Sequence, residues 1–170
     1  MSETENPPGH MPSSDARQES PPSRPFRSDA QEATIALLRT ASAVSRRLAR
    51  VVEPHGISLA QFNVLRILRG AGDDGLPTLA IRDRMIEEGS TVTRLLDKLE
   101  TAGYVRRSRC SPDRRQVLCW ITESGQSLLA LLDPHIDAAD AATVDMLNSA
   151  ERRDLIETLA RIRDGVPATG

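Results

Sequence analysis

The sequence predicts a mainly α-helical fold with a small β component, in which a winged helix-turn-helix lobe lies between long N- and C-terminal helices. Three observations predict this fold. Apolar residues recur every three or four positions over most of the chain, which is typical of amphipathic helices. Short helical patterns in the centre precede two strand-like segments, Tyr104–Arg109 and Val117–Ile121, around a polar turn. Longer helical patterns flank this central group on both sides.

Length and composition limit the class of protein. The 170 residues, 39% of them hydrophobic, suit one folded unit with tails. The longest apolar runs fall far short of the ~20 residues of a membrane helix, and the N-terminus lacks the apolar stretch of a secretory signal. Two cysteines fit a reducing compartment. We therefore expect a cytoplasmic protein with no membrane partner.

The formal net charge of −2 hides an uneven distribution. Residues 76–121 carry 9 basic and 6 acidic side chains, a net charge of +3, whereas residues 122–170 carry 4 basic and 9 acidic ones, a net charge of −5. A basic centre beside an acidic end predicts that the centre meets a polyanion and the end meets protein. The chain has four aromatic residues, too few for stacking along unpaired bases, so a single-stranded nucleic acid is not the expected partner.

The N-terminal third of the chain contains a tail and a long helix. Residues 1–27 hold 6 of the 11 prolines and are predicted to be a disordered tail. From Ser28 an apolar stripe predicts an amphipathic helix that ends near Pro54. The stripe consists of Ala30, Leu37, Ala41, Val44, Leu48 and Val51. Because its spacing suits packing against other helices or a partner chain, we assign residues 28–57 to one unit, a long helix and its loop.

Two shorter helices are expected next. Ser58 and Gln61 have the spacing of a capping box, which opens a helix that Gly70 and Gly72 end. Its buried positions are Phe62, Leu65, Ile67 and Leu68. After a turn at 73–75, Thr78 is expected to cap a short helix that buries Ile81 and Met85.

A fourth helix is predicted from Ser90 to Ala102, and its two faces differ in chemistry. The inner face consists of Val92, Leu95, Leu96 and Leu99. The outer face consists of Ser90, Thr93, Arg94, Asp97 and Lys98. Because an α-helix fits the major groove, and hydroxyls and guanidinium groups bind base edges and phosphates, this segment is a candidate recognition helix.

The predicted hairpin has a high density of positive charge. It contains Arg106, Arg107, Arg109, Arg114 and Arg115. So many like charges repel one another unless a polyanion is the partner. Arg114 and Arg115 stand in the turn, from which they could enter a minor groove. We assign residues 58–121 to the DNA-binding lobe.

Two further helices complete the predicted fold and form residues 122–165. Thr122 is expected to cap the first, within which Pro134 should cause a kink or an interruption. Its inner residues are Leu128, Leu129, Leu132 and Ile136. Asn148 and Glu151 have the spacing to cap the second, which should end near Asp164.

Four segments, 90–100, 103–107, 113–115 and 121–125, resemble in order and spacing the MarR family of bacterial transcriptional regulators. The resemblance covers roughly residues 28–165. It implies a homodimeric winged-helix protein that binds a pseudo-palindromic operator in double-stranded DNA and usually represses transcription. In the family the N- and C-terminal helices form the dimer, so residues 28–57 are expected to be a dimerisation helix and its loop, and residues 122–165 the C-terminal dimerisation helices. The resemblance also implies a small effector, often a phenolic or other aromatic anion, bound where the dimer helices meet the DNA-reading lobe. In the family the recognition helix matches residues 90–102, and the wing-tip Asp-x-Arg matches Asp113 and Arg115.

We assign the expected DNA-binding roles accordingly. Arg94 contacts a base or a phosphate, and Lys98 contacts a phosphate. Register and readout are assigned to Ser90, Thr91 and Thr93. Arg115 is assigned to the minor groove, and Arg109 and Arg114 to the DNA backbone. Asp97, which also points outward, is expected to orient an arginine rather than to meet DNA.

Two alternative functions stay open. A winged-helix protein-interaction module without DNA binding would present a neutral or apolar outer face on residues 90–102, and Arg94 and Lys98 argue against it. A redox-responsive regulator could use Cys110, whose thiol lies beside the arginine-rich turn. Cys119 alternates with apolar residues and is instead expected to pack in the interior.

No enzyme, cofactor or metal site is predicted. The sequence contains no phosphate-binding glycine loop and no nucleophile elbow. The three histidines are far apart in the sequence and lack the short spacing of a zinc site. A metal site would require Glu53, His55 and His135 to converge in the fold.

Overall fold

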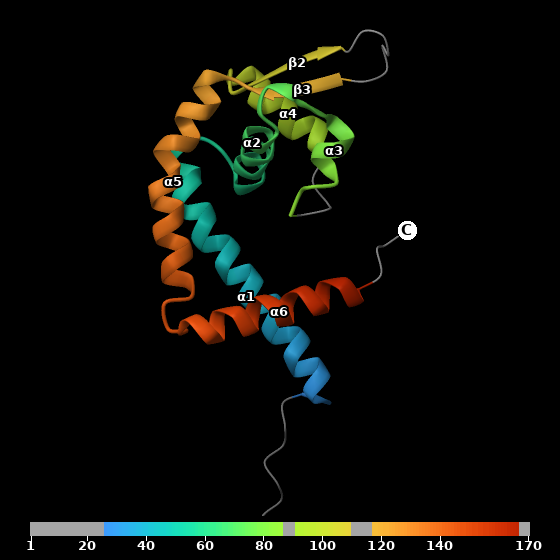
Figure 1. Ribbon diagram of the computed structural model, residues 1–170, viewed down its shortest axis with the longest axis vertical. Coiled ribbons are helices and arrows are strands. Elements are labelled where there is room, and N and C mark those ends of the chain that lie inside the picture. Colours follow the sequence, from blue (N-terminus) through green and yellow to red (C-terminus); the bar gives the residue numbers. More distant parts are fainter. Residues whose placement is uncertain (1–25, 87–90, 110–116, 167–170) are drawn as a thin grey trace, which may run out of the picture. The chain divides into compact units, whose positions relative to one another are not determined.

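The computed structural model describes residues 26–86, 91–109 and 117–166, with the backbone alone at Arg109 (Figure 1). Contacts divide the chain into Met1–Leu37 and Leu38–Gly170. Helix α1 (Asp29–Val52) spans this division and ends close to the predicted Pro54. At its start the Gln31 N–H donates to Ser28 Oγ (3.1 Å), and the Arg27 N–H donates to Gln31 Oε1 (2.7 Å). Residues 1–25, the greater part of the predicted tail, lie outside the described residues.

The second part contains the rest of α1 and the other elements, among which the predicted helices and strands follow one another in the predicted order. Within the described ranges they are the 3₁₀ turn Glu53–His55, α2 (Leu59–Ala71), the 3₁₀ turn Gly72–Asp74, β1 (Leu76–Pro77), α3 (Thr78–Arg82), α4 (Val92–Thr101), β2 (Val105–Arg109), β3 (Val117–Ile121), α5 (Glu123–Thr143) and α6 (Ser149–Gly165). A mainly helical chain with a small sheet confirms the predicted fold class. Across the described segments no helix has the length and apolarity that crossing a membrane requires.

Helix α2 forms as predicted. The Gln61 N–H donates to Ser58 Oγ (3.2 Å) and the Ser58 N–H donates to Gln61 Oε1 (2.9 Å), which confirms the capping box. Phe62, Leu65 and Leu68 are buried and Ile67 is half-buried, so the inner face is the predicted one.

Helix α3 differs from its prediction at both ends. Pro77, and not Thr78, is its N-cap residue, and no side chain caps the helix. The Thr78 hydroxyl lies instead 3.9 Å from Cys119 Sγ, because the preceding chain pairs with a strand. The helix ends at Arg82, so Met85 lies beyond it, although its side chain packs against the core as predicted.

The predicted hairpin is part of a three-stranded antiparallel sheet in the order β1-β3-β2. Strand β1, whose residue Leu76 pairs with Cys119, was not predicted from the sequence. Two residues, one of them proline, are too few to show alternation, and the strand exists because β3 offers it a partner. Figure 1 shows β2 and β3, the strands of the wing, above α2, α3 and α4.

A tight turn joins α4 to β2. The Tyr104 N–H donates to Leu99 O (2.9 Å) and the Gly103 N–H donates to Glu100 O (2.9 Å), and Gly103 has a φ of +77°. These bonds form a Schellman motif, in which glycine supplies the left-handed residue. The Thr122 hydroxyl donates to Gly103 O (2.7 Å), so the start of α5 is tied to this turn.

Helix α5 is capped by Thr122 as predicted, and it buries Leu128, Leu129, Leu132 and Ile136. It is not interrupted at Pro134, contrary to the stronger form of the prediction. The buried residues on either side of the proline keep both halves of the helix on the core, which offsets the missing hydrogen bond.

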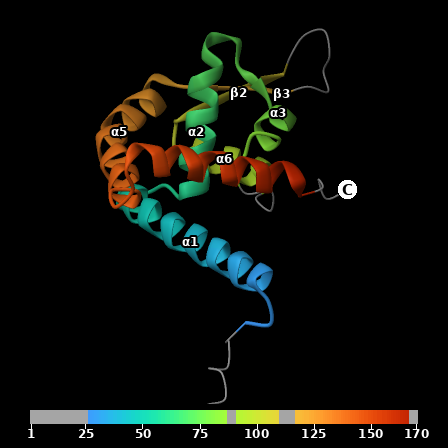
Figure 2. The same ribbon diagram turned by 60° about the horizontal axis from the view of Figure 1, so that its bottom comes forward.

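Helix α6 follows a short link and runs across the direction of α5 (Figures 1 and 2). Asn148 and Glu151 form its predicted capping box, with the Glu151 N–H donating to Asn148 Oδ1 (3.1 Å). None of its residues is buried within the chain. A helix without a buried face is stabilised by packing against something else.

Candidate nucleic-acid interface

Helix α4 separates an apolar face from a polar one, as predicted. Val92, Leu96 and Leu99 are buried and Leu95 packs against the core. The predicted contact residues Thr91, Thr93, Arg94 and Lys98 are all exposed. The helix begins at Val92 rather than Ser90, and Thr91 is its N-cap residue. The structure thus brings these four side chains together on one helix.

Four other predicted site residues cannot be placed in the same way. Ser90, Arg114 and Arg115 lie outside the described residues, as does the side chain of Arg109, whose backbone ends β2. Cys110, the candidate redox residue, also lies outside the described residues. Their roles stay predictions.

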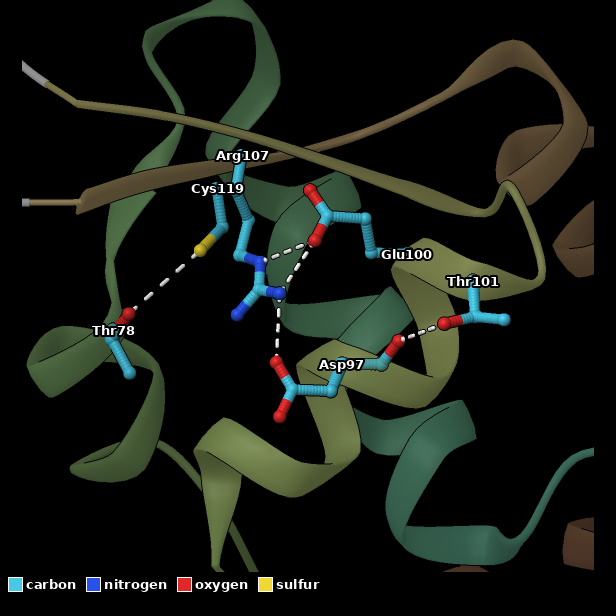
Figure 3. A network of polar contacts seen from close by, with 6 residues as sticks. All are labelled: Thr78, Asp97, Glu100, Thr101, Arg107 and Cys119. Carbon is cyan, nitrogen blue, oxygen red and sulfur yellow. Dashed lines mark hydrogen bonds and ion pairs between the residues drawn. The ribbon is translucent and has the colours of Figure 1, made fainter.

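Arg107 forms the main polar network of the lobe (Figure 3). Its Nε donates to Glu100 Oε2 (2.9 Å), its Nη2 also donates to that oxygen, and Nη2 lies 2.7 Å from Asp97 Oδ1. In Figure 3 the guanidinium lies between the two carboxylates, below the strands and above α4. Arg107, one of the five arginines whose crowding predicted a polyanionic partner, therefore has two acidic partners on α4 itself.

Asp97 has the predicted role, since it contacts an arginine. Glu100 was not identified as a partner in the sequence analysis. The signal was present in Gly103, because the tight turn after it returns β2 over the last turns of α4. The two acids lie on the flank of α4 that faces the strands. At ~100° per residue, Arg94 and Lys98 lie ~40° apart on a neighbouring part of the helix surface.

Electrostatics follow from this geometry. The Arg107 hydrogen bond holds the pKa of the Glu100 carboxyl below its ordinary value, and the same bond raises the pKa of Arg107. Both groups therefore stay charged at neutral pH.

Arg106 also has a partner within the protein. Its guanidinium carbon lies 4.1 Å from the centroid of the Trp120 ring, which is a cation–π contact. Arg106 and Trp120 are register partners on β2 and β3, so they share one face of the sheet while Arg107 and Cys119 share the other. Arg106, like Arg107, needs no polyanion to hold its side chain in place.

Cys119 is a core residue, as predicted. It is fully buried, and burial raises the pKa of its thiol. A protonated, buried thiol reacts slowly with oxidants and electrophiles.

A second feature of the lobe is a cleft of about 290 Å³ between α2 and α5. Buried Phe62 and Ile136 contribute its apolar surface. The two terminal guanidinium nitrogens of Arg69 donate to the two carboxylate oxygens of Asp133 (2.7 and 3.1 Å). The guanidinium carbon of Arg66 lies 5.9 Å from the centroid of the Phe62 ring. Asp137 and Asp140 also line the cleft.

The residues proposed as a conditional metal site do not converge. Over the described ranges, no three His, Cys, Asp or Glu side chains form a group that could hold a metal ion. Glu53, His55 and His135 are all within these ranges.

Comparisons with known proteins agree with this architecture. The family model described as "MarR family" matches residues 57–117. The transcriptional regulator TtmR of Methylorubrum extorquens is 34% identical over 137 residues, which cover 79% of this chain and 67% of that protein. The MepR–DNA complex of S. aureus (TM-score 0.72, 21% identity, 78% of this chain and 97% of that one) shares the fold. So does Bordetella bronchiseptica BpsR, whose DNA binding is regulated by 6-hydroxynicotinic acid (TM-score 0.70, 23% identity, 78% and 98%).

The described elements and the polar face of α4 define a winged helix-turn-helix protein of the DNA-reading class. The identity to TtmR over most of both chains places it more narrowly. The chain belongs to the MarR family of transcriptional regulators.

Proposed function

We propose that this protein is a ligand-responsive repressor that binds a pseudo-palindromic operator as a homodimer. The observation that carries the proposal is the outer face of α4. Arg94, Lys98 and two threonine hydroxyls are exposed there, while the acids of the helix pair with Arg107. The DNA complex of the structurally similar MepR supports the same use of the fold.

In this proposal α4 enters the major groove. Arg94 contacts a base or a phosphate, Lys98 contacts a phosphate, and Thr91 and Thr93 set register and readout. The residues whose side chains the structure does not describe keep the roles expected from the sequence. Ser90 contributes to readout, Arg115 enters the minor groove, and Arg109 and Arg114 bind the backbone.

The homodimer is supported by the exposed apolar residues of α6. They are Leu155, Ile156, Leu159 and Ile162, and exposed Val166 directly follows the helix. Ile156 is 66% exposed and Ile162 is 45% exposed, although a single chain gains nothing from presenting them to water. In the proposed homodimer a second copy covers these residues, and the two α4 helices enter successive major grooves, about 10 base pairs apart.

The experiment is a titration of labelled DNA from upstream of the gene, with a random-sequence duplex for comparison. We expect the upstream duplex to bind more tightly. Arg94→Ala should weaken this binding by roughly 1–3 kcal/mol, the range for a specific contact. Arg153→Ala, which removes an exposed arginine from α6, is the control for loss of charge.

Two outcomes would count against the assignment. Equal affinity of the wild-type protein for both duplexes would contradict operator recognition and favour the protein-interaction alternative. Full-strength binding by Arg94→Ala would remove Arg94 from the interface.

The proposed effector site is the cleft between α2 and α5. The Phe62 ring offers an apolar surface, and Arg66 and Arg69 offer cations for an anionic group. The aspartates on the α5 side would accept hydrogen bonds from a ring hydroxyl. A hydroxylated aromatic acid therefore fits both sides of the cleft.

The test uses 6-hydroxynicotinic acid and 4-hydroxybenzoic acid as probes. We expect either compound to raise the melting temperature of the protein and to release it from the upstream duplex. Arg66→Ala should weaken the effect of the acid severalfold without weakening DNA binding in its absence. Equal effects in Arg66→Ala and wild type would place the site elsewhere.

A further inference from the structure

We propose that Arg107 is a positioning residue for DNA recognition, which holds and neutralises Asp97 and Glu100 so that α4 can approach the phosphates. This inference rests on the proposed DNA-binding function. It assigns to a wing-strand arginine a role in binding without a contact to DNA.

The first step is the charge of the recognition helix. Between Val92 and Thr101 α4 carries two cations, Arg94 and Lys98, and two acids, Asp97 and Glu100. The helix alone therefore has no net charge with which to attract DNA. The guanidinium of Arg107 changes this balance to +1.

The second step is the position of the acids. Asp97 follows Arg94 by three residues, so the two side chains lie ~60° apart around the helix. The Asp97 side chain is 56% exposed and that of Glu100 is 39% exposed. A carboxylate so close to a DNA-binding arginine would meet the same phosphates, and such like-charge juxtaposition weakens binding.

The third step is the geometry of Arg107. Its side chain is 23% exposed, and Nε and Nη2 point toward the two acids rather than away from the protein (Figure 3). A guanidinium held by two carboxylates acts as a fixed counter-charge. This arrangement favours compensation over a direct contact between Arg107 and DNA.

The test compares variants on a duplex that the wild-type protein has selected from a random-sequence pool, at low salt. Arg107→Gln should weaken binding about tenfold or more, because two uncompensated carboxylates then lie on α4 beside the face that meets the phosphates. The double variant D97N/E100Q should bind at least as tightly as wild type. The triple variant D97N/E100Q/R107Q should return to within about threefold of wild type, because the charges are removed together.

Each competing explanation predicts another pattern. If Arg107 contacts DNA itself, the triple variant stays as weak as Arg107→Gln. If the network serves only to hold β2 on α4, D97N/E100Q is weakened as well. Either result would overturn the proposal.

Two further measurements keep the test decisive. Urea unfolding of each variant separates lost binding from lost folding. If Arg107→Gln does not fold, the comparison of D97N/E100Q with the triple variant still decides the question, because Arg107 is dispensable without the acids only if it acts by compensating them. Arg107→Lys keeps the charge and should retain most of the affinity. Failure of the wild-type protein to enrich any duplex would instead contradict the proposed function itself.

Discussion

Gly75 shows how a single residue can decide the shape of the lobe. It has a φ of +67° and a ψ of 178°, a conformation that other residues rarely adopt. A Cβ on this residue would lie 2.4 Å from Trp120 Nε1. That same indole nitrogen donates to Asp73 O (3.0 Å). The glycine therefore lets the α2–α3 connection close against the wing.

We predict that Gly75→Ala destabilises the protein. Backbone strain costs roughly 1–3 kcal/mol at such a position, and displacement of Trp120 adds to it. Urea unfolding monitored by tryptophan fluorescence measures the change, and the emission of the sole tryptophan should shift to the red in the folded variant. The matched control is Gly70→Ala, where the added methyl meets nothing within 4 Å in a helix. It should stabilise by about 0.5–1 kcal/mol. Destabilisation of equal size in both variants would contradict the argument.

At the scale of the element, local signals were sufficient to predict the helices and insufficient for the sheet and the site. Capping pairs such as Asn148 and Glu151 act over three residues, so neighbouring residues alone determine where the helix begins. Strand β1 has two residues and depends on a partner 41 positions away, as in the pairing of Pro77 with Leu118. The ion pairs of Arg107 with Asp97 and Glu100 likewise depend on a turn that folds β2 back over α4. The exposed polar face of α4 could therefore be predicted from the sequence. The arginines of β2 that have partners within the protein could not.

The ion pair between Arg69 and Asp133 joins α2 to α5. Its hydrogen bonds to Arg69 lower the pKa of the Asp133 carboxyl below its ordinary value of 3.8. A carboxyl with a depressed pKa in the folded state stabilises the protein above its unfolded pKa, and this contribution is lost as the pH falls through the folded pKa.

We therefore predict that Asp133→Asn lowers stability at pH 7 by roughly 0.2–1 kcal/mol, a small value because both side chains are 39% exposed. The difference from wild type should shrink as the pH falls below 3.8. Urea unfolding at a series of pH values measures it, with Asp137→Asn, from the same cleft, as the control. A difference that persists at the lowest pH would show that the ion pair is not its source.

At the scale of the molecule, α5 is the element that can transmit the effect of a ligand bound in the cleft to the proposed DNA-binding face of α4. It is joined to α2 through Arg69 and Asp133 and to the α4–β2 turn through Thr122 and Gly103. A ligand that binds Arg69 competes with Asp133 for the same guanidinium. Such a ligand changes DNA affinity only insofar as it prefers one placement of α5 over another.

The proposed homodimer, with Arg94 and Lys98 exposed on each α4, predicts a steep salt dependence. If two protomers together contact ~6–10 phosphates, operator affinity should fall by about 10³–10⁵ between roughly 50 and 200 mM salt. The double variant I156E/I162E places two charges on the apolar face of α6 and should give monomers. In the wild type the slope of log K against log salt should lie between about −5 and −9. Each monomer of the variant contacts half as many phosphates, so its slope should be about half of the wild-type slope. Fluorescence anisotropy over a salt series measures the slopes, and sedimentation equilibrium confirms the oligomeric state. A monomeric variant with the wild-type slope would mean that one protomer makes all the phosphate contacts, and the two-helix geometry would then be wrong.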